Sequence, residues 1–319
     1  MTAPPPPPSV EVVEYTDPLC PWAWGSEPVF RRLRAALGGR VLWRRVHGLL
    51  FDVDDDPAPD PAAETAWYAR HVEEISAHTR APRAERLSRV AASSWPASLA
   101  AKAAELQGEE VAGRVLRRLR ETVFVLGEPA DTPALALAAV RGAPGLDPVR
   151  LATDAAADDV LARVRADRAE ARRPVREALA ARGPSPHPGA AKETGDGGYR
   201  YALPTLLVRA PAGQHVVPGW RSYEEYASAV EELCPGLLRT PDPLPPDEAL
   251  RRYRSLTDPE RALLVTGAWP PPEAVRVDTG NGPLWLHPDE AATHPATARG
   301  ARAVRWPGSD LPSRNRPTK

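Results

Sequence analysis

The fold of this chain is decided at Asp17-Pro18-Leu19-Cys20-Pro21-Trp22-Ala23, the junction between a strand pattern and a helical pattern. Before this junction, residues 10–15 have the β-branched, alternating character of a strand. After it, residues 21–37 place apolar side chains at helical spacing, with a proline at the first position and two glycines behind the last. Because residues 41–46 read as a second strand, the first 50 residues predict a strand, helix, strand unit with Cys20 at its turn.

Helical periodicity dominates the middle of the chain, from about residue 57 to residue 182. A cluster of glycine and proline over residues 183–198 interrupts it. Two strand patterns between residues 203 and 217 then predict a hairpin, and a capping box at Ser222-Tyr223-Glu224-Glu225 predicts the start of a closing helix. We therefore expect one α/β domain over residues 10–234, in which a helical insertion over about 57–182 separates two groups of strands.

A proline-rich stretch, residues 235–246, follows this domain and predicts a stiff linker. Beyond it, two short helical patterns and a turn signal at residues 279–282 predict two helices and a β-hairpin. Together they make a small module over residues 247–289 that resembles a reduced winged helix. The ends of the chain predict a disordered proline-rich tail over residues 1–9 and a basic flexible tail over residues 290–319.

The composition narrows the classes of function. With 42% hydrophobic and 26% charged residues among 319, the chain is typical of folded proteins, and its formal net charge of -1 gives no reason to expect nucleic acid as a partner. No stretch is apolar enough for a membrane span. Two cysteines are too few for a disulfide scaffold. Because the first residues lack the positive and apolar regions of a secretory signal, we expect a cytoplasmic protein.

The stretch at Cys20 resembles the active-site turn of the DsbA-like branch of the thioredoxin superfamily, which typically reads Asp-Pro-x-Cys-Pro-Trp-Cys. Members of this family carry a helical domain inside the thioredoxin fold, followed by a cis-proline loop, here Leu203-Pro204-Thr205, a hairpin and a closing helix. The resemblance covers residues 10–234 and points in particular to the cytoplasmic members, which have a single active-site cysteine. It implies an α/β thioredoxin fold with a large helical insertion.

The resemblance also implies which residues make the site. It makes Cys20 the catalytic nucleophile and implies a cis peptide bond before Pro204, which would turn the start of the strand toward Cys20. The backbone of Leu203 would then be free to pair with a bound, extended peptide. The residues expected to contact a substrate are Pro21, Trp22, Leu203, Pro204 and Thr205. Trp22 and Trp24 fit an apolar rim for substrates and a packing role in the core about equally well.

The physical case for Cys20 is its place in front of a helix. A sulfur there faces unpaired backbone N–H groups and the positive end of the helix dipole, which can lower the pKa of a thiol from about 8.5 toward about 3.5 to 7.5. The alternative is an inert buried thiol, which is common for free cysteines. The position before a proline-capped helix favours a reactive site. Cys234 ends a helix far along the chain and fits a packed thiol.

Ala23 departs from the family pattern, because the second cysteine of the motif is absent. In a Cys-x-x-Cys motif the second thiolate attacks the mixed disulfide from within the same molecule. Without it, a redox cycle needs an outside thiol to release Cys20, and a low-molecular-weight thiol would be the co-substrate. We expect no other cofactor and no metal, because the seven histidines show no metal-ligand spacing.

The leading hypothesis is a thiol-disulfide oxidoreductase that works through Cys20 alone, with protein or small-molecule thiols and disulfides as partners. The alternative is a non-catalytic thioredoxin-fold adaptor of the protease-adaptor type, in which the domain is a docking surface. This alternative suits the proline-rich linker and the C-terminal module, because the module could bind a protein partner. A third hypothesis is a small-molecule transferase or isomerase of the same fold; Cys20 counts against it, because such proteins usually have serine there.

Overall fold

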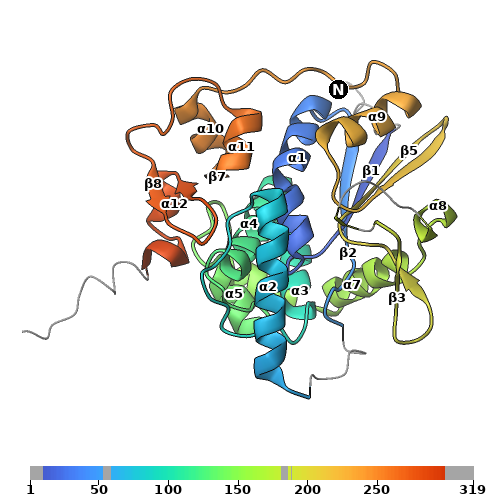
Figure 1. The fold of residues 1–319 in the computed structure, drawn as a ribbon, viewed down its shortest axis with the longest axis horizontal. Coiled ribbons are helices and arrows are strands. Elements are labelled where there is room, and N and C mark those ends of the chain that lie inside the picture. The colour runs from blue at the N-terminus through green and yellow to red at the C-terminus, as the bar shows by residue number, and fades with distance from the viewer. Residues whose placement is uncertain (1–9, 53–58, 181–185, 188, 299–319) are drawn as a thin grey trace, which may run out of the picture.

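A four-stranded sheet lies at the centre of the computed structural model, which describes residues 10–52, 59–180, 186, 187 and 189–298. Its strands are β1 Glu11–Thr16, β2 Leu42–His47, β5 Thr205–Ala210 and β6 Gly213–Pro218. They lie in the order β2-β1-β5-β6, and only β1 and β2 are parallel (Figure 1). The predicted strand, helix, strand unit and the predicted hairpin are therefore both confirmed, and they share one sheet.

Helices cover both faces of this sheet. On one face, α1 (Pro21–Leu37) and α9 (Tyr223–Leu233) pack against Val12 and form one apolar core with it. On the other face, the last turn of α7 (Asp158–Ala171) lies in a second core that contains Val13. Because successive side chains of a strand point to opposite faces, two neighbouring valines enter two different cores.

The ends of the first and last helices of this domain follow local signals in the sequence. Cys20 is the N-cap of α1 and Pro21 its first residue, while Gly38 ends the helix in the left-handed conformation with φ 55°. The capping box that opens α9 is complete, since Ser222 and Glu225 each bond the other's backbone N–H. These helix boundaries are predicted correctly from the sequence, because contacts between residues close together in the chain determine them.

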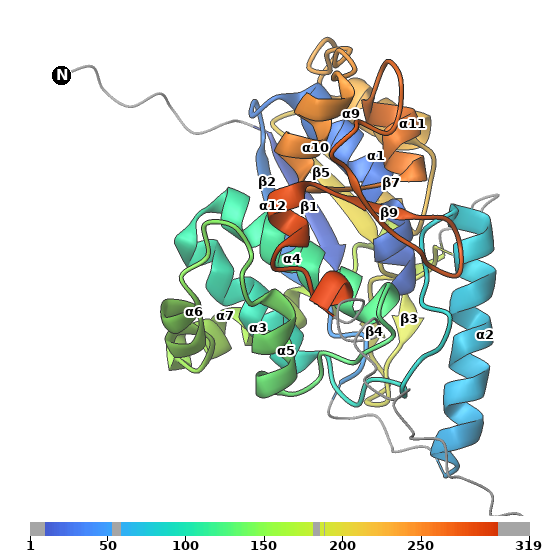
Figure 2. The ribbon, with the colours of Figure 1, turned by 90° about the vertical axis from the view of Figure 1, so that its left-hand side faces the viewer.

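A block of helices lies between β2 and β5, as predicted. Its elements are α2 Pro61–Thr79, α3 Trp95–Ala104, a 3-10 turn η1 Glu105–Gln107, α4 Glu109–Phe124, α5 Pro133–Val140, α6 Pro148–Ala155, α7 and α8 Arg176–Leu179. The central helix α3 packs against α4, α5, α6 and α7, because its buried side chains are mostly alanine and allow close approach. Figure 2 shows α2 standing along one side of the molecule.

Two parts of this region differ from the prediction of a nearly all-helical block followed by a loop. Residues 80–94 run without helix between α2 and α3. Within the glycine and proline cluster, β3 (Lys192–Glu193) and β4 (Tyr199–Arg200) pair as a short antiparallel ladder. A pair of two-residue strands leaves too short a pattern for a sequence argument to detect.

The C-terminal module is built from short elements around its own small core. They are α10 Pro246–Tyr253, β7 Ser255–Thr257, α11 Asp258–Leu264, β8 Val275–Val277, β9 Leu284–Leu286 and α12 Pro288–Ala291. The sheet order is β7-β9-β8, and both pairings are antiparallel. The two predicted helices and the hairpin are confirmed, whereas β7 was not predicted.

The prediction of a flexible tail from residue 290 onward is wrong for residues 290–298. His294 is buried and its Nε2 lies 3.0 Å from Oε2 of Glu121 on α4. The hydroxyl of Thr293 donates to the carbonyl of Gly142 at 2.9 Å. Contacts with the helical block therefore extend the module beyond its predicted end. The predicted tails at residues 1–9 and 299–319 lie outside the described residues.

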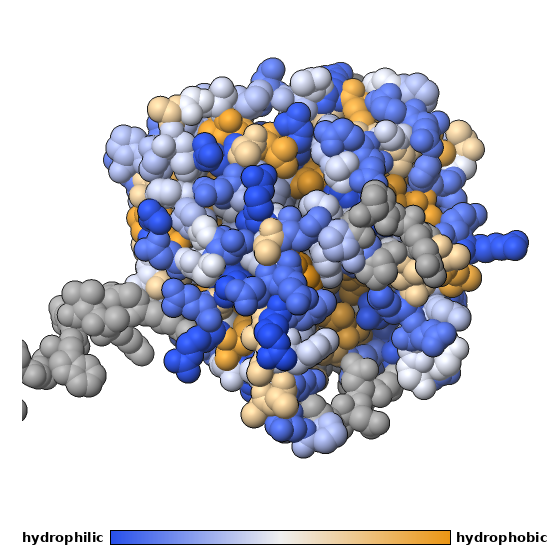
Figure 3. Space-filling model, viewed as in Figure 1, coloured by the Kyte–Doolittle hydropathy of each residue, from blue (hydrophilic) through white to orange (hydrophobic). Residues whose placement is uncertain are grey.

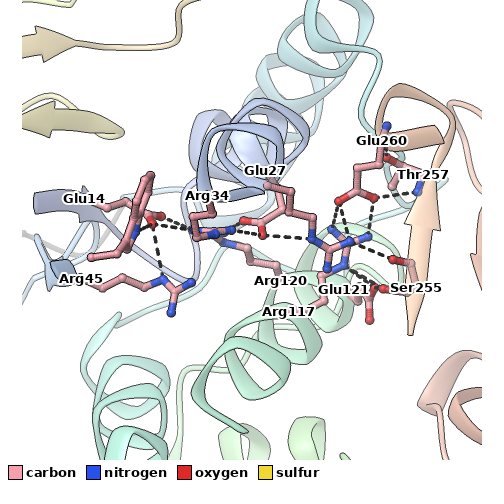
Figure 4. A network of polar contacts seen from close by, with 12 residues as sticks. Glu14, Glu27, Arg34, Arg45, Arg117, Arg120, Glu121, Ser255, Thr257 and Glu260 are labelled. Carbon is pink, nitrogen blue, oxygen red and sulfur yellow. Dashed lines mark hydrogen bonds and ion pairs between the residues drawn. The ribbon is translucent and has the colours of Figure 1, made fainter. Parts of the chain in front are cut away.

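A buried network of ion pairs joins the module to the rest of the molecule (Figure 4). Arg117 on α4 makes a bidentate ion pair with Glu260 on α11, through two hydrogen bonds of 2.9 and 3.0 Å. Arg31 on α1 binds the same carboxylate at 2.9 Å and donates to the backbone carbonyl of Ser255. Because these groups are almost completely withdrawn from water, each depends on its partner for stabilisation. The module is thus fixed against α1 and α4.

The surface of the molecule is mixed. Figure 3 shows hydrophobic residues interspersed among hydrophilic ones on the face it draws. The large hydrophobic side chains described as exposed come from six different elements and are Leu42, Trp67, Leu135, Val149, Leu179 and Tyr199. Among the described residues, no helix combines the length and the apolar character needed to cross a membrane.

Candidate functional site

Cys20 occupies the predicted junction between β1 and α1. Its backbone N–H donates to the carbonyl of Asp17 at 3.2 Å, and its own carbonyl accepts the N–H of Trp24 at 3.0 Å. Cys20 therefore closes the turn through its N–H group and accepts the first hydrogen bond of the helix with its carbonyl. Its side chain is turned inward, however, and only 3% of the residue is exposed to solvent.

The loop at Pro204 lies directly against Cys20, although 183 residues separate the two motifs. The peptide bond between Leu203 and Pro204 is cis. The Cys20 thiol donates to the carbonyl oxygen of Leu203 at an Sγ to O distance of 3.4 Å. Thr205 is buried, and its hydroxyl donates to the carbonyl of Ala202 at 2.6 Å. The structure thus brings together the two motifs that the sequence offered as one site.

A histidine that the sequence did not single out covers this loop. His187 is buried, and its Nε2 lies 3.0 Å from the carbonyl oxygen of Leu203. Its Nδ1 accepts the backbone N–H of Gly189 at 3.0 Å, so the ring proton is on Nε2, which donates to Leu203. Burial lowers the pKa of His187 to about 4, which keeps the ring neutral. No motif or spacing marked this histidine, because its role depends on a contact across the chain.

The contact from His187 corrects one expectation about substrate binding. The backbone of Leu203 was expected to be free to pair with an extended peptide. Its carbonyl oxygen instead already accepts hydrogen bonds from the Cys20 thiol and from His187. A peptide that used this carbonyl would have to displace both donors. The site is therefore closed by groups of the chain itself.

Aromatic rings from α1, α2 and two loops lie beside the site. Trp22 meets the ring of His187 edge-on at 5.1 Å between centroids and the ring of His78 at 5.9 Å. His78 on α2 in turn meets Trp220 at 4.6 Å. Trp22 is only partly buried, so of its two predicted roles the structure favours the apolar rim. Trp24 is buried and donates to the carbonyl of Pro82 at 2.8 Å, which makes it a core residue.

Burial dominates the electrostatics of Cys20. It raises the pKa of the thiol to about 11, and the nearby carboxylate of Asp17 raises it further. The backbone N–H groups of Ala23 and Trp22 act in the opposite direction but do not compensate. The predicted lowering of the pKa is therefore wrong, because the helix N-terminus stabilises a thiolate less than the loss of water destabilises it. Asp17, also fully buried, has its pKa raised to about 6 for the same reason.

Neither the motif nor the rest of the chain places a second thiol at Cys20. Ala23 is completely buried one turn into α1. Cys20 and Cys234 are both free. Cys234 is the C-cap of α9 and packs in the core between α1, α9 and the sheet, whereas Cys20 belongs to the core on the opposite face. The sheet therefore separates the thiol of Cys234 from that of Cys20.

The chemistry open to this site follows from its contents. Among residues 10–298, as far as they are described, no group of three or more histidine, cysteine, aspartate and glutamate side chains could hold a metal ion. The reactive groups at hand are one thiol, one neutral histidine and one buried carboxyl group. Once the site is opened to solvent, the thiol can form a mixed disulfide. While the site stays closed, these groups can hold the loop at Pro204 in place.

Comparisons with known proteins add three findings. Residues 14–172 match the Thioredoxin family model described as "Thioredoxin". The chain is 33% identical over 141 residues to a ClpXP adapter protein SpxH from Shouchella clausii, covering 43% of this chain and 45% of that protein. It is 29% identical over 119 residues to the protein of the same name from Bacillus subtilis, covering 36% and 38%. The chain thus matches less than half the length of these relatives.

One solved structure has the same fold over most of its length. A putative protein disulfide isomerase from Nitrosomonas europaea superposes with a TM-score of 0.53 and 16% sequence identity. The superposition covers 70% of this chain and 95% of that one. This likeness concerns the arrangement of strands and helices.

Proposed function

Since this chain has the thioredoxin fold and its Cys20 turn resembles that of the DsbA-like branch, we propose that it works as a protein-binding adapter, in which the closed Cys20 site is part of a docking surface. One observation carries the proposal. The Cys20 thiol is 3% exposed, its hydrogen is bonded to the carbonyl of Leu203, and its pKa is raised to about 11. Such a thiol is protonated and covered under neutral conditions.

The proton on Cys20 limits redox chemistry at this site. With a pKa of about 11, about one thiol in ten thousand is ionised at pH 7. Attack on a disulfide requires the thiolate, so this small ionised fraction slows the reaction, and the stronger nucleophilicity of a thiolate with a high pKa offsets only part of the loss. The step after attack is also slow, because Ala23 cannot release a bound partner. Both arguments favour binding over turnover.

The sequence relatives support the same proposal. Two proteins that match the chain at 33% and 29% identity are named ClpXP adapters. An adapter needs two surfaces, one for the client protein and one for the protease. The thioredoxin domain and the C-terminal module would provide them, because buried ion pairs hold the two in a fixed relation. We propose that the chain presents a client to a ClpXP-type protease.

A degradation assay tests this proposal. Proteins that bind the immobilised chain would serve as clients for purified ClpXP, with the wild-type chain or the Cys20→Ser variant added in solution. We expect both chains to speed degradation to the same extent, because binding does not require the thiol. If neither chain speeds the degradation of any bound client, the adapter function is wrong. If only the wild type does so, a redox step at Cys20 is essential.

The second candidate function remains a thiol-disulfide oxidoreductase with one nucleophile. The observation that favours it is the position of Cys20, at the N-cap of α1 and opposite the cis peptide bond at Pro204. In this reaction the Cys20 thiolate attacks a disulfide R–S–S–R, the mixed disulfide forms, and one thiolate leaves. An outside thiol must then attack the mixed disulfide and release Cys20 reduced. Rapid formation of a glutathione adduct at pH 7 would support this function against the adapter.

A further inference from the structure

A cavity of about 400 Å³ lies where α1, α4 and the C-terminal module meet, away from Cys20. Its volume falls within the range of small-molecule sites in proteins. Seven arginines line it. Four of them pair with buried glutamates and are called the inner arginines, Arg31, Arg34, Arg45 and Arg117; the other three are called the outer arginines, Arg114, Arg252 and Arg254. So many guanidinium groups around one hollow make it a candidate site for an anion.

The inner arginines are already neutralised and give the cavity a rigid wall. Figure 4 shows Arg34, Arg45 and Arg117 within the buried network. Arg31 joins it through Glu27 and Glu260, at 3.4 and 2.9 Å. Arg34 binds Glu14 and Glu27, at 3.3 and 2.9 Å. Arg117 binds Glu121 and Glu260, at 2.7 and 2.9 Å. The carboxylates of these pairs are nearly withdrawn from water, so a ligand would not displace them.

The outer arginines are compensated much less. Arg252 has no ion pair with any carboxylate that the structure describes. Arg254 has one, Asp289 at 3.4 Å, whose side chain is 75% exposed and free to turn into solvent. Arg114 has an equally exposed partner, Glu110. Exposed pairs of this kind contribute little, so these three arginines keep most of their charge available to a ligand.

One residue in the lining points to the same conclusion. The buried Nε–H group of Arg254 makes no hydrogen bond, whereas Nε of Arg45 is paired with Oε2 of Glu14 at 3.4 Å. Arg254 also has a backbone conformation that residues other than glycine rarely adopt, with φ 64° and ψ -37°. Its backbone is held on both sides, since its N–H donates to Leu250 and its carbonyl accepts the N–H of His287. Strained residues and unpaired donors are concentrated at binding sites.

We propose that this cavity binds a compact anion with several phosphate groups. Guanidinium groups bind phosphate oxygens through two parallel hydrogen bonds, and phosphate presents more charge and more acceptors than a carboxylate. Four glutamates also line the cavity, of which Glu27 and Glu290 are neutralised by arginines behind them. Glu109 and Glu110 also line the cavity, and Glu110 is paired with Arg114, so we expect it to hold a multiply charged anion in preference to a singly charged one.

Calorimetric titration of the full chain with inorganic tripolyphosphate tests this site. The titration is run at constant ionic strength, with sulfate as the reference for general attraction to positive charge. We expect one tripolyphosphate per chain with a micromolar dissociation constant and no measurable saturation by sulfate. The same weak heat from both anions would overturn the proposal.

Neighbouring residues on α10 provide matched variants. Arg252→Gln removes a charge from this cavity, whereas Arg251→Gln removes one that faces a separate cavity of the module. Both side chains are exposed, so both variants should fold. We expect Arg252→Gln to weaken tripolyphosphate binding about tenfold and Arg251→Gln less than twofold. Equal effects of the two variants would show that the anion responds to the general surface charge and not to this cavity, which would overturn the proposal.

The ligand class is tested with three further probes. ATP and pyrophosphate separate a nucleotide from an inorganic source, and tighter binding of any phosphate probe than of sulfate supports the proposal. An oligoglutamate peptide tests an acidic protein segment, and peptide binding tighter than all phosphate probes would overturn the phosphate class. Arg254→Lys keeps the charge but removes the planar donor pair, so binding should fall although the net charge is unchanged.

Discussion

At the scale of the residue, Cys20 shows how two effects of position compete. Its place at the N-terminus of α1 favours the thiolate, and its burial under the Pro204 loop disfavours it. Burial prevails and raises the pKa of the thiol to about 11. The thiolate fraction near neutral pH is therefore more than 100-fold lower than that of an ordinary thiol, whose pKa is about 8.5.

This leads to a prediction for alkylation. Because the folded protein raises the pKa of Cys20, its reaction with iodoacetamide should remain slow through neutral pH and rise up to about pH 11. Rates measured from pH 6 to 11 on the wild type, with Cys20→Ser subtracted to remove the contribution of Cys234, check this. An inflection below pH 8 would show that the helix N-terminus outweighs burial and would favour the oxidoreductase.

His187 gives a second prediction at the same scale. Replacing it by alanine removes the donor on the carbonyl of Leu203 and one ring from the wall beside Trp22. We expect alkylation of Cys20 at pH 9 to become several-fold faster in His187→Ala, because the thiol gains access to water. His215→Ala, a change on the outer strand β6, is the matched control and should leave the rate unchanged. An unaltered rate in His187→Ala would mean that other groups cover the thiol.

At the scale of the element, α1 and α4 have two tasks each. α1 supplies the N-cap for the site and, on its far side, Arg31 for the module. α4 crosses the helical block and supplies Arg117 and Glu121 to the same network. Charged residues on an amphipathic helix ordinarily predict a solvated face. Here they are buried because a third element, α11, covers them.

The network predicts an unequal response of two ion pairs to mutation. Glu260→Gln leaves Arg31 and Arg117 buried with less compensation, so we expect a loss of about 3 to 5 kcal/mol in the free energy of unfolding. Asp154→Asn breaks the exposed pair with Arg150 and should cost less than about 0.5 kcal/mol. Urea unfolding of both variants gives the comparison. Similar losses would show that the network around Glu260 is hydrated.

At the scale of the whole molecule, the module and the thioredoxin domain act as one body. The residues that join them are buried arginines and glutamates, and the last described segment is fastened to α4 through His294 and Glu121. A module on a stiff linker could have been an independent unit. The contacts across the junction make it part of one structure, and they also create the arginine-lined cavity.

One body should unfold in one step. We expect a single calorimetric transition for the full chain, and a chain ending at residue 245 should lose stability because it exposes the network around Arg31 and Arg117. Differential scanning calorimetry of both chains provides the measurement. Two separate transitions in the full chain, with the thioredoxin domain unchanged after truncation, would show that the junction contributes little.

The sequence by itself determined most of the elements and their order; β3, β4 and β7 are the exceptions. Hydrophobic periodicity gave the strands and helices, proline and glycine gave the ends of α1, and Ser222 and Glu225 gave the start of α9. All these signals act between residues a few positions apart, so they can be read along the chain. The resemblance at Cys20 and at Leu203-Pro204-Thr205 then gave the thioredoxin fold.

Only the tertiary structure decided the state of the site and the joining of the module. The pKa of Cys20 depends on how much water its neighbours exclude, and these neighbours include Leu203, 183 residues away. The same is true of His187 above Leu203, and of Glu260 between Arg31 and Arg117. Burial and charge pairing are sums over residues brought together by folding, so no local pattern in the sequence contains them.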